Sequence, residues 1–183
     1  MPKMSITKCS PSPNDIFLLD TNILIHLFYP TLSNTYMKEY ENWYGRSIRN
    51  NSKFILPAVQ LSEFVNRCIR FQFDLYAGKE CSNSFDFKRD YRGTDDYRNC
   101  MNAILDIINQ DILKNFQPVD DCFNSIDLKN LLCYGFSYDF NDALLVQIAE
   151  KHHASIVTHD VDFANYKTTQ LILTDNKKLL MFS

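Results

Sequence analysis

Glycine is scarce in this sequence. The 183 residues include four glycines, Gly45, Gly78, Gly93 and Gly135. No two of them are close enough to form a Walker A loop, a G-x-G-x-x-G turn or a G-x-S-x-G elbow. The spacing therefore excludes P-loop NTPases, Rossmann dehydrogenases and ordinary α/β-hydrolases.

Paired cysteines and long apolar runs are also missing. The six cysteines show no C-x-x-C spacing, and Cys68 and Cys133 lie inside apolar segments, where a free thiol behaves as a small hydrophobic group. We therefore expect a reduced, cytoplasmic protein. No apolar run is long enough to cross a bilayer, so no membrane partner is expected.

Positive charge is not in excess either. The formal net charge is -3 at pH 7, so any nucleic acid must be held by local features and not by the summed charge of the protein. The composition is 45% hydrophobic and 22% charged, which supplies enough apolar side chains for the core of one globular domain.

Short apolar runs alternate with segments of helical period. Strands are predicted at residues 16–19, 54–56, 155–158 and 170–174, each a continuous apolar run of the kind found in buried parallel sheets. Helices are predicted at 23–29, 35–48, from 58 onward, from 104 to Pro118, at 126–132 and at 142–153. This alternation predicts an α/β fold with a mostly parallel sheet.

The chain is predicted to form a single domain over residues 14–183. Residues 1–13 are rich in serine and proline without periodicity, and we expect them to be a flexible N-terminal lead. Residues 78–99 contain five acidic and five basic side chains and few aliphatic ones, so we expect a polar, solvated insert there.

Four acidic residues lie close to the ends of predicted strands. Asp20 follows the first strand directly, and Asp160 follows strand 155–158 after one intervening residue, His159. Glu63 lies in the helix after strand 54–56, and Asp142 opens the helix before strand 155–158. Since ligands bind at the carboxyl ends of strands in open α/β sheets, these carboxylates are candidates for one shared site.

Each acid also has a structural interpretation. Asp20 is a good helix cap, and Glu63 can pair with Arg67 one helical turn later. Asp160 can start a turn, with Asp162 as an equal competitor. Asp142 is in line with the apolar stripe of its helix, and a carboxylate directed to the buried side needs a partner.

A hard divalent cation explains such a cluster. Carboxylates held together at neutral pH repel one another unless a cation compensates them. Mg²⁺ or Mn²⁺ takes oxygen ligands together with water and substrate phosphate oxygens, so it would allow an acidic protein to hold a polyanion. A bound cation would also activate water for attack at phosphorus.

Three segments of the chain resemble the PIN-domain family, and most closely its VapC-like toxin ribonucleases of toxin-antitoxin pairs. The segments are IFLLDTNILIHLF, LPAVQLSEFVNRC and NDALLVQIAEKHHASIVTHDVDF. They supply D-T-N after the first strand, a glutamate in the helix after a strand-proline turn, and a D-A helix start followed by T-x-D-x-D-F. The match covers about residues 15–70 and 125–175.

The resemblance implies a three-layer α/β/α sandwich with a central parallel sheet and a Mg²⁺- or Mn²⁺-dependent endoribonuclease. Its acidic metal site would be Asp20, Glu63, Asp142 and Asp160, with Asn22 and Thr158 as supporting polar groups. A deprotonated water would attack the RNA phosphate and leave a 5′-phosphate and a 3′-hydroxyl. The family also implies a homodimer and a cognate antitoxin partner.

Some features depart from the family pattern. Asp139 and Asp162 are additional acids near the site, so Asp162 is an alternative to Asp160 as the fourth ligand. The insert at 78–99 lengthens the chain and supports another hypothesis, a non-catalytic RNA- or protein-binding module on the same scaffold. A phosphoacceptor receiver domain is disfavoured, because it needs two adjacent acids after the first strand and Asp20 is followed by Thr21.

Overall fold

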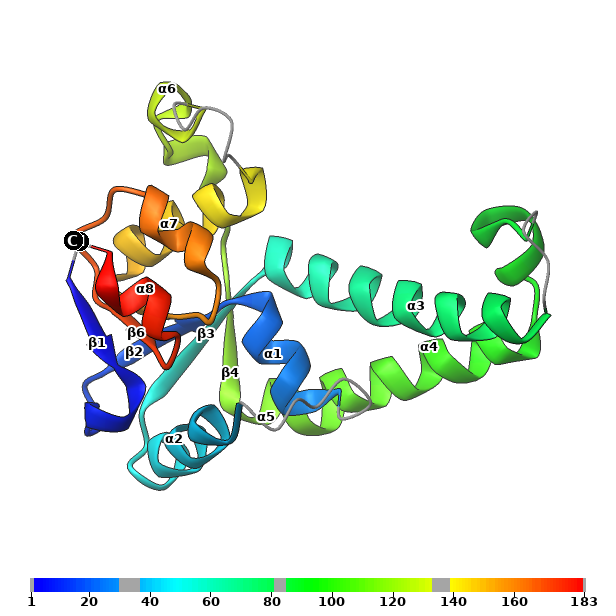
Figure 1. Ribbon diagram of the computed structural model, residues 1–183, viewed down its shortest axis with the longest axis horizontal. Coiled ribbons are helices and arrows are strands. Elements are labelled where there is room, and N and C mark those ends of the chain that lie inside the picture. The colour runs from blue at the N-terminus through cyan, green and yellow to red at the C-terminus, as the bar shows by residue number, and fades with distance from the viewer. Residues whose placement is uncertain (1, 30–36, 81–84, 133–138, 183) are drawn as a thin grey trace.

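The structure is a computed structural model that describes residues 2–29, 37–80, 85–132 and 139–182. Its centre is one six-stranded sheet in the order β1-β6-β5-β2-β3-β4, and every neighbouring pair is parallel (Figure 1). The strands are β1 (Lys3–Ser5), β2 (Ile16–Leu19), β3 (Lys53–Pro57), β4 (Phe116–Val119), β5 (Ser155–Val157) and β6 (Ile172–Thr174). The α-helices are α1 (Thr21–Phe28), α2 (Lys38–Arg49), α3 (Ala58–Glu80), α4 (Asp95–Ile107), α5 (Leu113–Asn115), α6 (Leu128–Leu131), α7 (Phe140–His152) and α8 (Lys177–Met181).

Both faces of the sheet are covered by helices. Successive strand residues point to opposite faces, so Phe17 and Leu19 of β2 join one buried core while Leu18 joins the other. The first core also includes buried residues of α1, α2, α3 and α4, and the second includes residues of α6, α7 and α8. These two cores explain the continuously apolar strands, and the predicted three-layer α/β/α class is confirmed.

The order of the strands reverses at β2. The chain passes from β2 to β3 and β4 on one side, and then returns to place β5 and β6 on the other side of β2. The gap between the carboxyl ends of β2 and β5 is therefore the topological switch point, where open α/β sheets bind their ligands. Asp20 directly follows β2, and Thr158 directly follows β5.

The expectation that residues 1–13 form a flexible lead is wrong for residues 3–8. Residues Lys3–Ser5 form the edge strand β1, which pairs with β6 from Lys3 opposite Ile172 to Ser5 opposite Thr174. The 3-10 helix Ile6–Lys8 follows, and Ile6 is completely buried in the first core. A three-residue strand is too short to produce a periodic pattern, which is why the sequence did not predict it.

Helices α3 and α4 form an antiparallel arm that projects from the body of the molecule (Figure 1). The region 78–99, expected to be a solvated insert, contains a short π-helix (Phe87–Tyr91) at the end of this arm. Phe87 and Tyr91 are buried among aromatic side chains that include Phe73 and Tyr97. The expectation of a wholly solvated segment is therefore wrong, because aromatic residues form the core that aliphatic residues form elsewhere.

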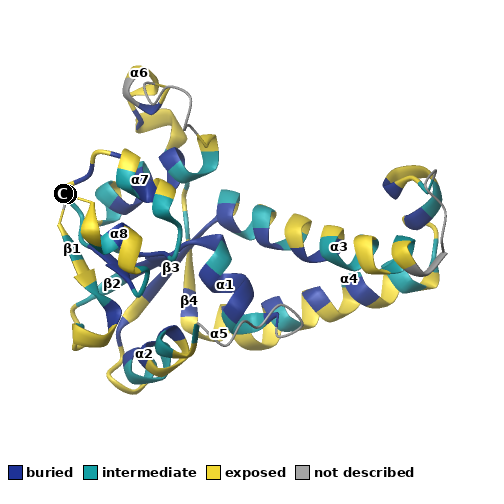
Figure 2. Ribbon diagram, in the orientation of Figure 1, coloured by how far each residue is buried: buried dark blue, intermediate teal, exposed yellow. Residues whose placement is uncertain are grey.

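Most charged side chains described in the same region do lie at the surface, as predicted. Figure 2 shows the arm with buried positions facing its own interior and exposed positions over its outer surface. Lys88, Arg89 and Arg92 are exposed, and Arg89 pairs with Asp90 at 2.7 Å. Residues 81–84 of the insert lie outside the described residues.

Two further predictions need correction. The helix expected up to Pro118 ends earlier, since residues 116–119 form β4 at the edge of the sheet, where a proline costs no ladder hydrogen bond. The helix expected at 126–132 is shorter, at Leu128–Leu131.

The other predicted helices match the observed ones to within a few residues. Part of the helix expected at 35–48 falls on residues 30–36, which lie outside the described residues. Among the helices of the described ranges, none combines the length and the apolar composition that crossing a membrane requires.

Candidate metal centre and nuclease site

Asp20 occupies the end of β2 and the start of α1. Its extended backbone makes it the N-cap of α1, and its Oδ1 accepts a hydrogen bond from the backbone N–H of Asn22 at 3.4 Å. The side-chain amide of Asn22 donates to Oδ2 at 3.3 Å. Only 4% of Asp20 is exposed. The same buried carboxylate therefore caps α1 and lies at the predicted site.

Thr158 links Asp20 to Asp160. The completely buried Thr158 hydroxyl donates to Oδ2 of Asp20 at 2.8 Å and accepts from the backbone N–H of Asp160 at 2.9 Å. One residue at the end of β5 thus fixes the acid that follows β2 and the loop that holds the next acid. Thr158 therefore lies between the two acids, and its supporting role in the site stays a prediction.

Glu63 extends from the first turns of α3 toward the same edge of the sheet. Its Oε2 accepts a hydrogen bond from the Thr21 hydroxyl at 3.0 Å, and its Oε1 lies 3.6 Å from Arg67 one turn later. The i,i+4 pair that the sequence suggested is therefore present. This ion pair does not exclude a role for Glu63 in the site, because the negative charge of Glu63 also helps to raise the pKa of Asp20.

Asp142 approaches from the opposite face of the sheet, in the first turn of α7. Asp139 is the N-cap of this helix and accepts from the backbone N–H groups of Asn141 at 2.8 Å and Asp142 at 3.2 Å. Asp139, and not Asp142, therefore caps this helix. The Asp142 carboxylate is left without a capping role and faces the other acids.

The acids act on one another electrostatically. Burial, with added repulsion from Asp160 and Glu63, raises the pKa of Asp20 to about 6. Burial raises the pKa of Asp142 to about 8, and the charges of Asp20, Asp139, Asp160 and Glu63 act in the same direction. The four predicted carboxylates therefore converge, and in the absence of a cation Asp142 holds its proton at neutral pH.

Asp162 occupies a different position. Its backbone N–H donates to Oδ1 of Asp160 at 2.9 Å, which makes Asp160 the cap of the 3-10 helix Val161–Asn165, and its own side chain is exposed. Asp160, and not Asp162, is among the charges that raise the pKa of Asp20 and of Asp142. The geometry thus favours Asp160 over Asp162 as the fourth acid.

The donor set fits a hard divalent cation in its chemistry. All four side chains offer carboxylate oxygens, and a bound cation would relieve the burial and mutual repulsion that raise the pKa values of Asp20 and Asp142. Within the described ranges, however, no three acidic, histidine or cysteine side chains lie in an arrangement that could hold a metal ion. A cation at this position would therefore need water or substrate oxygens to complete its ligands, as Mg²⁺ typically does.

Two residues that the sequence did not single out position the site. The hydroxyl of Tyr40 in α2 donates to the carbonyl oxygen of Thr158 at 3.0 Å and accepts from the backbone N–H of Asp175 at 2.8 Å. The amide of the buried Gln60 donates to the carbonyl oxygen of Leu19, directly before Asp20. Both residues lie in ordinary helical patterns, so no sequence signal distinguished them from core residues.

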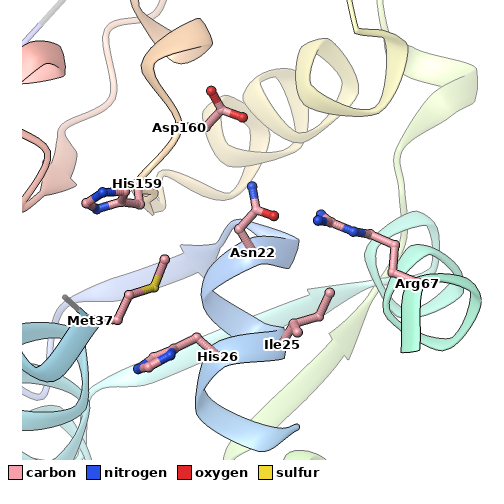
Figure 3. Close-up of a pocket in the computed structure, with 7 residues that line it drawn as sticks. All are labelled: Asn22, Ile25, His26, Met37, Arg67, His159 and Asp160. Atoms are coloured by element: carbon pink, nitrogen blue, oxygen red, sulfur yellow. The ribbon is translucent and has the colours of Figure 1, made fainter. Parts of the chain in front are cut away.

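A pocket of about 310 Å³ adjoins the acidic residues (Figure 3). Figure 3 shows Asn22 projecting from the start of α1, with Asp160 above it and Arg67 extending toward it from α3. Seven residues line the pocket: Asn22, Ile25, His26, Met37, Arg67, His159 and Asp160. Asn22 and Asp160 therefore belong to both the pocket and the acidic site.

The PIN domain model matches this chain over residues 17–168, which includes all four converging acids. The chain belongs to the PIN domain family. Proteins with a PIN domain are generally nucleases, and they generally use divalent metal ions. No curated protein matches the sequence of this PIN domain.

One similar solved structure is the crystal structure of VapBC2 from Rickettsia felis bound to a DNA fragment from their promoter. It shares 18% sequence identity with this PIN domain at a TM-score of 0.49, covering 86% of this chain and 98% of that chain. A likeness of this size does not bear on the function of the present protein.

Proposed function

We propose that this protein is a Mg²⁺- or Mn²⁺-dependent endoribonuclease. The observation that supports it best is the convergence of Asp20, Glu63, Asp142 and Asp160 at the topological switch point of a PIN domain, where burial and mutual repulsion raise the pKa values of Asp20 and Asp142. In this proposal the four carboxylates hold the cation and Asn22 supports them. The expected products carry a 5′-phosphate and a 3′-hydroxyl.

The bound cation would supply charge compensation and an activated water for attack at phosphorus. The residues of the chain have separate tasks. Asp20 is held by Thr158 and Asn22 and cannot turn away from the site. Arg67, whose side chain is about half exposed beside Glu63, is placed to contact a phosphate of the RNA.

The alternative hypothesis, a non-catalytic binding module using the insert, has less support. It relied on aromatic side chains at 78–99 stacking on bases. Phe87 and Tyr91 are buried in the arm, and the guanidinium of Arg70 covers the ring of Phe87 at 3.9 Å. Their ring faces are thus already used within the protein.

We further propose that the protein is the toxin of a toxin-antitoxin pair, acts in the cytoplasm and forms a homodimer. The support is the three-part motif that resembles the VapC-like toxins, D-T-N at Asp20, the glutamate at Glu63 and T-x-D-x-D-F from Thr158. Co-expression with the product of a small neighbouring gene would restore growth of cells that this protein arrests. Arrest that persists with every adjacent gene product would contradict the antitoxin part of the proposal.

The nuclease proposal is tested by incubating purified protein with tRNA and with unstructured RNA in Mg²⁺, Mn²⁺ or EDTA. Cleavage is expected with the metals and not with EDTA, and Asp20→Asn should lower the rate by at least about a hundredfold, as the loss of an essential site group does. Asp106→Asn, on the exposed side of α4, is the matched control and should cleave normally. Equal cleavage by wild type and Asp20→Asn would overturn the proposal.

A further inference from the structure

The pocket next to the acidic residues has a size and lining that the metal site does not explain. Its volume of about 310 Å³ is at the lower end of the range of small-molecule pockets, which is about 300–1,000 Å³. Asp160 forms part of its wall, so a group inside it lies directly beside the proposed catalytic centre (Figure 3). The space accommodates one small ring system and not a folded peptide.

The lining combines apolar surface with hydrogen-bonding groups. Ile25 and Met37 supply the apolar part, and Asn22, His159 and Arg67 supply amide, imidazole and guanidinium groups. Among the described residues that line the pocket, Asp160 is the one acidic side chain. A flat heteroaromatic base has apolar faces and a polar edge, and it matches such a lining better than a phosphate group does.

The hydroxyl of Tyr40 orients the ring of His159. Its Nδ1 lies 3.0 Å from the Tyr40 hydroxyl, whose single proton is directed to the Thr158 carbonyl at 3.0 Å. This contact holds the ring through Nδ1 and leaves Nε2 as the ring nitrogen open to a ligand. Nε2 has no hydrogen-bond partner in the described part of the chain, so it is available to the polar edge of a base.

His26 closes the pocket below Met37 (Figure 3). Its side chain is only 4% exposed, and its Nε2 faces Oε1 of Glu41 at 3.0 Å. Burial between α1 and α2 limits how far this imidazole can rotate, so this part of the pocket wall has a defined shape. A rigid wall of fixed shape is what discrimination between bases requires.

We propose that this pocket binds the base of the nucleotide adjacent to the cleaved phosphate, taken unstacked from single-stranded RNA. The inference rests on the proposed nuclease function and adds its substrate class and the residues that select it. His159 and Asn22 contact the polar edge of the base, Ile25 and Met37 contact its faces, and Arg67 contacts the attached phosphate. Base identity at this one position therefore sets where the RNA is cut.

Nucleotide binding is tested by NMR of the histidine ring signals in the full chain, with EDTA present. The probes are the four nucleoside 5′-monophosphates, AMP, CMP, GMP and UMP, titrated separately. The protein has four histidines. His26 and His159 line the pocket, and His152 and His153 lie at the C-terminal end of α7. We expect saturable shifts of the first two signals and none of the second two, with affinities that differ about tenfold among the probes, as one hydrogen bond produces.

Two pairs of variants locate the binding. Met37→Trp fills the pocket and should abolish the shifts, whereas Met181→Trp, at a position 81% exposed in α8, should leave them unchanged. Arg67→Ala should weaken binding about tenfold, and Arg98→Ala, an exposed arginine paired with Asp95 on α4, should not. Arg67 is partly exposed, so this variant tests the pocket even if Met37→Trp fails to fold.

The outcomes separate this inference from the nuclease proposal. Specific shifts that depend on Met37 and Arg67 support the pocket even if no RNA is cleaved, in which case only the nuclease proposal fails. RNA cleavage without any nucleotide shift at His26 and His159 would overturn the base pocket alone. Equal affinity for all four nucleotides, or shifts that survive Met37→Trp, would also overturn it.

To distinguish a nucleotide in an RNA chain from a free one, the same titration is made with the four homodinucleotides. If the pocket serves RNA, the preferred dinucleotide should bind more tightly than its mononucleotide and shift the same two signals. A mononucleotide that binds more tightly than every dinucleotide would instead assign the pocket to a free nucleotide and contradict the proposed substrate.

Discussion

At Asp142, burial and four neighbouring carboxylates act in the same direction and raise the pKa to about 8. The folded protein thus holds protons at Asp142 and Asp20 that the unfolded chain, with an ordinary aspartate pKa near 3.8, has released. Such groups stabilise the fold below about pH 4, and this contribution is lost as the pH rises through the folded pKa values of about 6 and about 8. The folded state then contains charges that repel one another.

Without metal, we therefore expect the thermal midpoint to fall between pH 5 and pH 8 and the fall to be smaller in Asp142→Asn. At pH 8 this variant should be more stable than the wild type by several degrees, since about 1 kcal/mol corresponds to about 2–4 °C in a domain of this size. Thermal unfolding in EDTA at several pH values measures both effects. Asp106→Asn should follow the wild type, and an unchanged pH dependence in Asp142→Asn would contradict the assigned repulsion.

Individual site residues differed in how far the sequence could predict them. Asp20 and Asp160 follow apolar strands, so their meeting at one sheet edge follows from the rule for parallel sheets. Tyr40 and Gln60 could not be predicted, because a hydrogen bond to a distant carbonyl oxygen leaves no mark on helical spacing. The two hydrogen bonds that join the Thr158 hydroxyl to Asp20 and to the Asp160 backbone depend on the pairing of β2 with β5. That pairing becomes known only from the fold.

Among the elements, β1 is the one that the sequence pattern missed most completely. The contribution of the segment formed by β1 and the following 3-10 helix is tested by Ile6→Ala in that 3-10 helix, which should cost about 2–5 kcal/mol, because Ile6 is fully buried and an Ile-to-Ala change leaves a cavity in a core. Chemical denaturation measures the loss. Thr7→Ala at the neighbouring exposed position is the control. Equal stability of the two variants would restore the interpretation of residues 1–13 as a flexible lead.

The arm of α3 and α4 is stabilised by aromatic packing at its tip. Phe87 contacts Phe73 edge to face at 5.3 Å and lies under the guanidinium of Arg70. We expect Phe87→Ala to cost up to about 3–5 kcal/mol locally and to speed hydrogen exchange within residues 85–101, with little change in β2 and β5. Phe123→Ala, at a ring 50% exposed, is the matched control and should leave the arm unchanged.

Exchange that speeds up equally in the arm and in the sheet would contradict a separately stabilised tip.

The arm also shows why the sequence pattern of residues 78–99 predicts its structure only in part. Its alternating charges predict solvation correctly for the outer surface, but a helical pattern made of aromatic residues and interrupted by a π-helix has no regular apolar period. The start of α4 was missed for the same reason, although Thr94 caps it through the N–H of Tyr97 at 3.1 Å.

For the molecule as a whole, the fold class was predictable and the strand order was not. Alternating strands and helices indicate a parallel sheet, and the PIN domain match agrees with it. The order β1-β6-β5-β2-β3-β4 requires that β1 and β4 be recognised, and both are short edge strands without a periodic signal. The candidate site was still predictable, because its acids lie next to the interior strands that the sequence shows clearly.

At this scale the central claim is that acids from four separate segments form one site that a divalent cation completes. Calorimetric titration of Mn²⁺ into the protein at pH 7, repeated in buffers of different ionisation enthalpy, measures binding and proton release together. The wild type and Asp106→Asn should bind Mn²⁺ and release about one proton, because a cation displaces the proton held at Asp142. Asp142→Asn should bind at least about tenfold more weakly and release fewer protons. Mn²⁺ binding by Asp142→Asn with wild-type affinity and wild-type proton release would contradict the account.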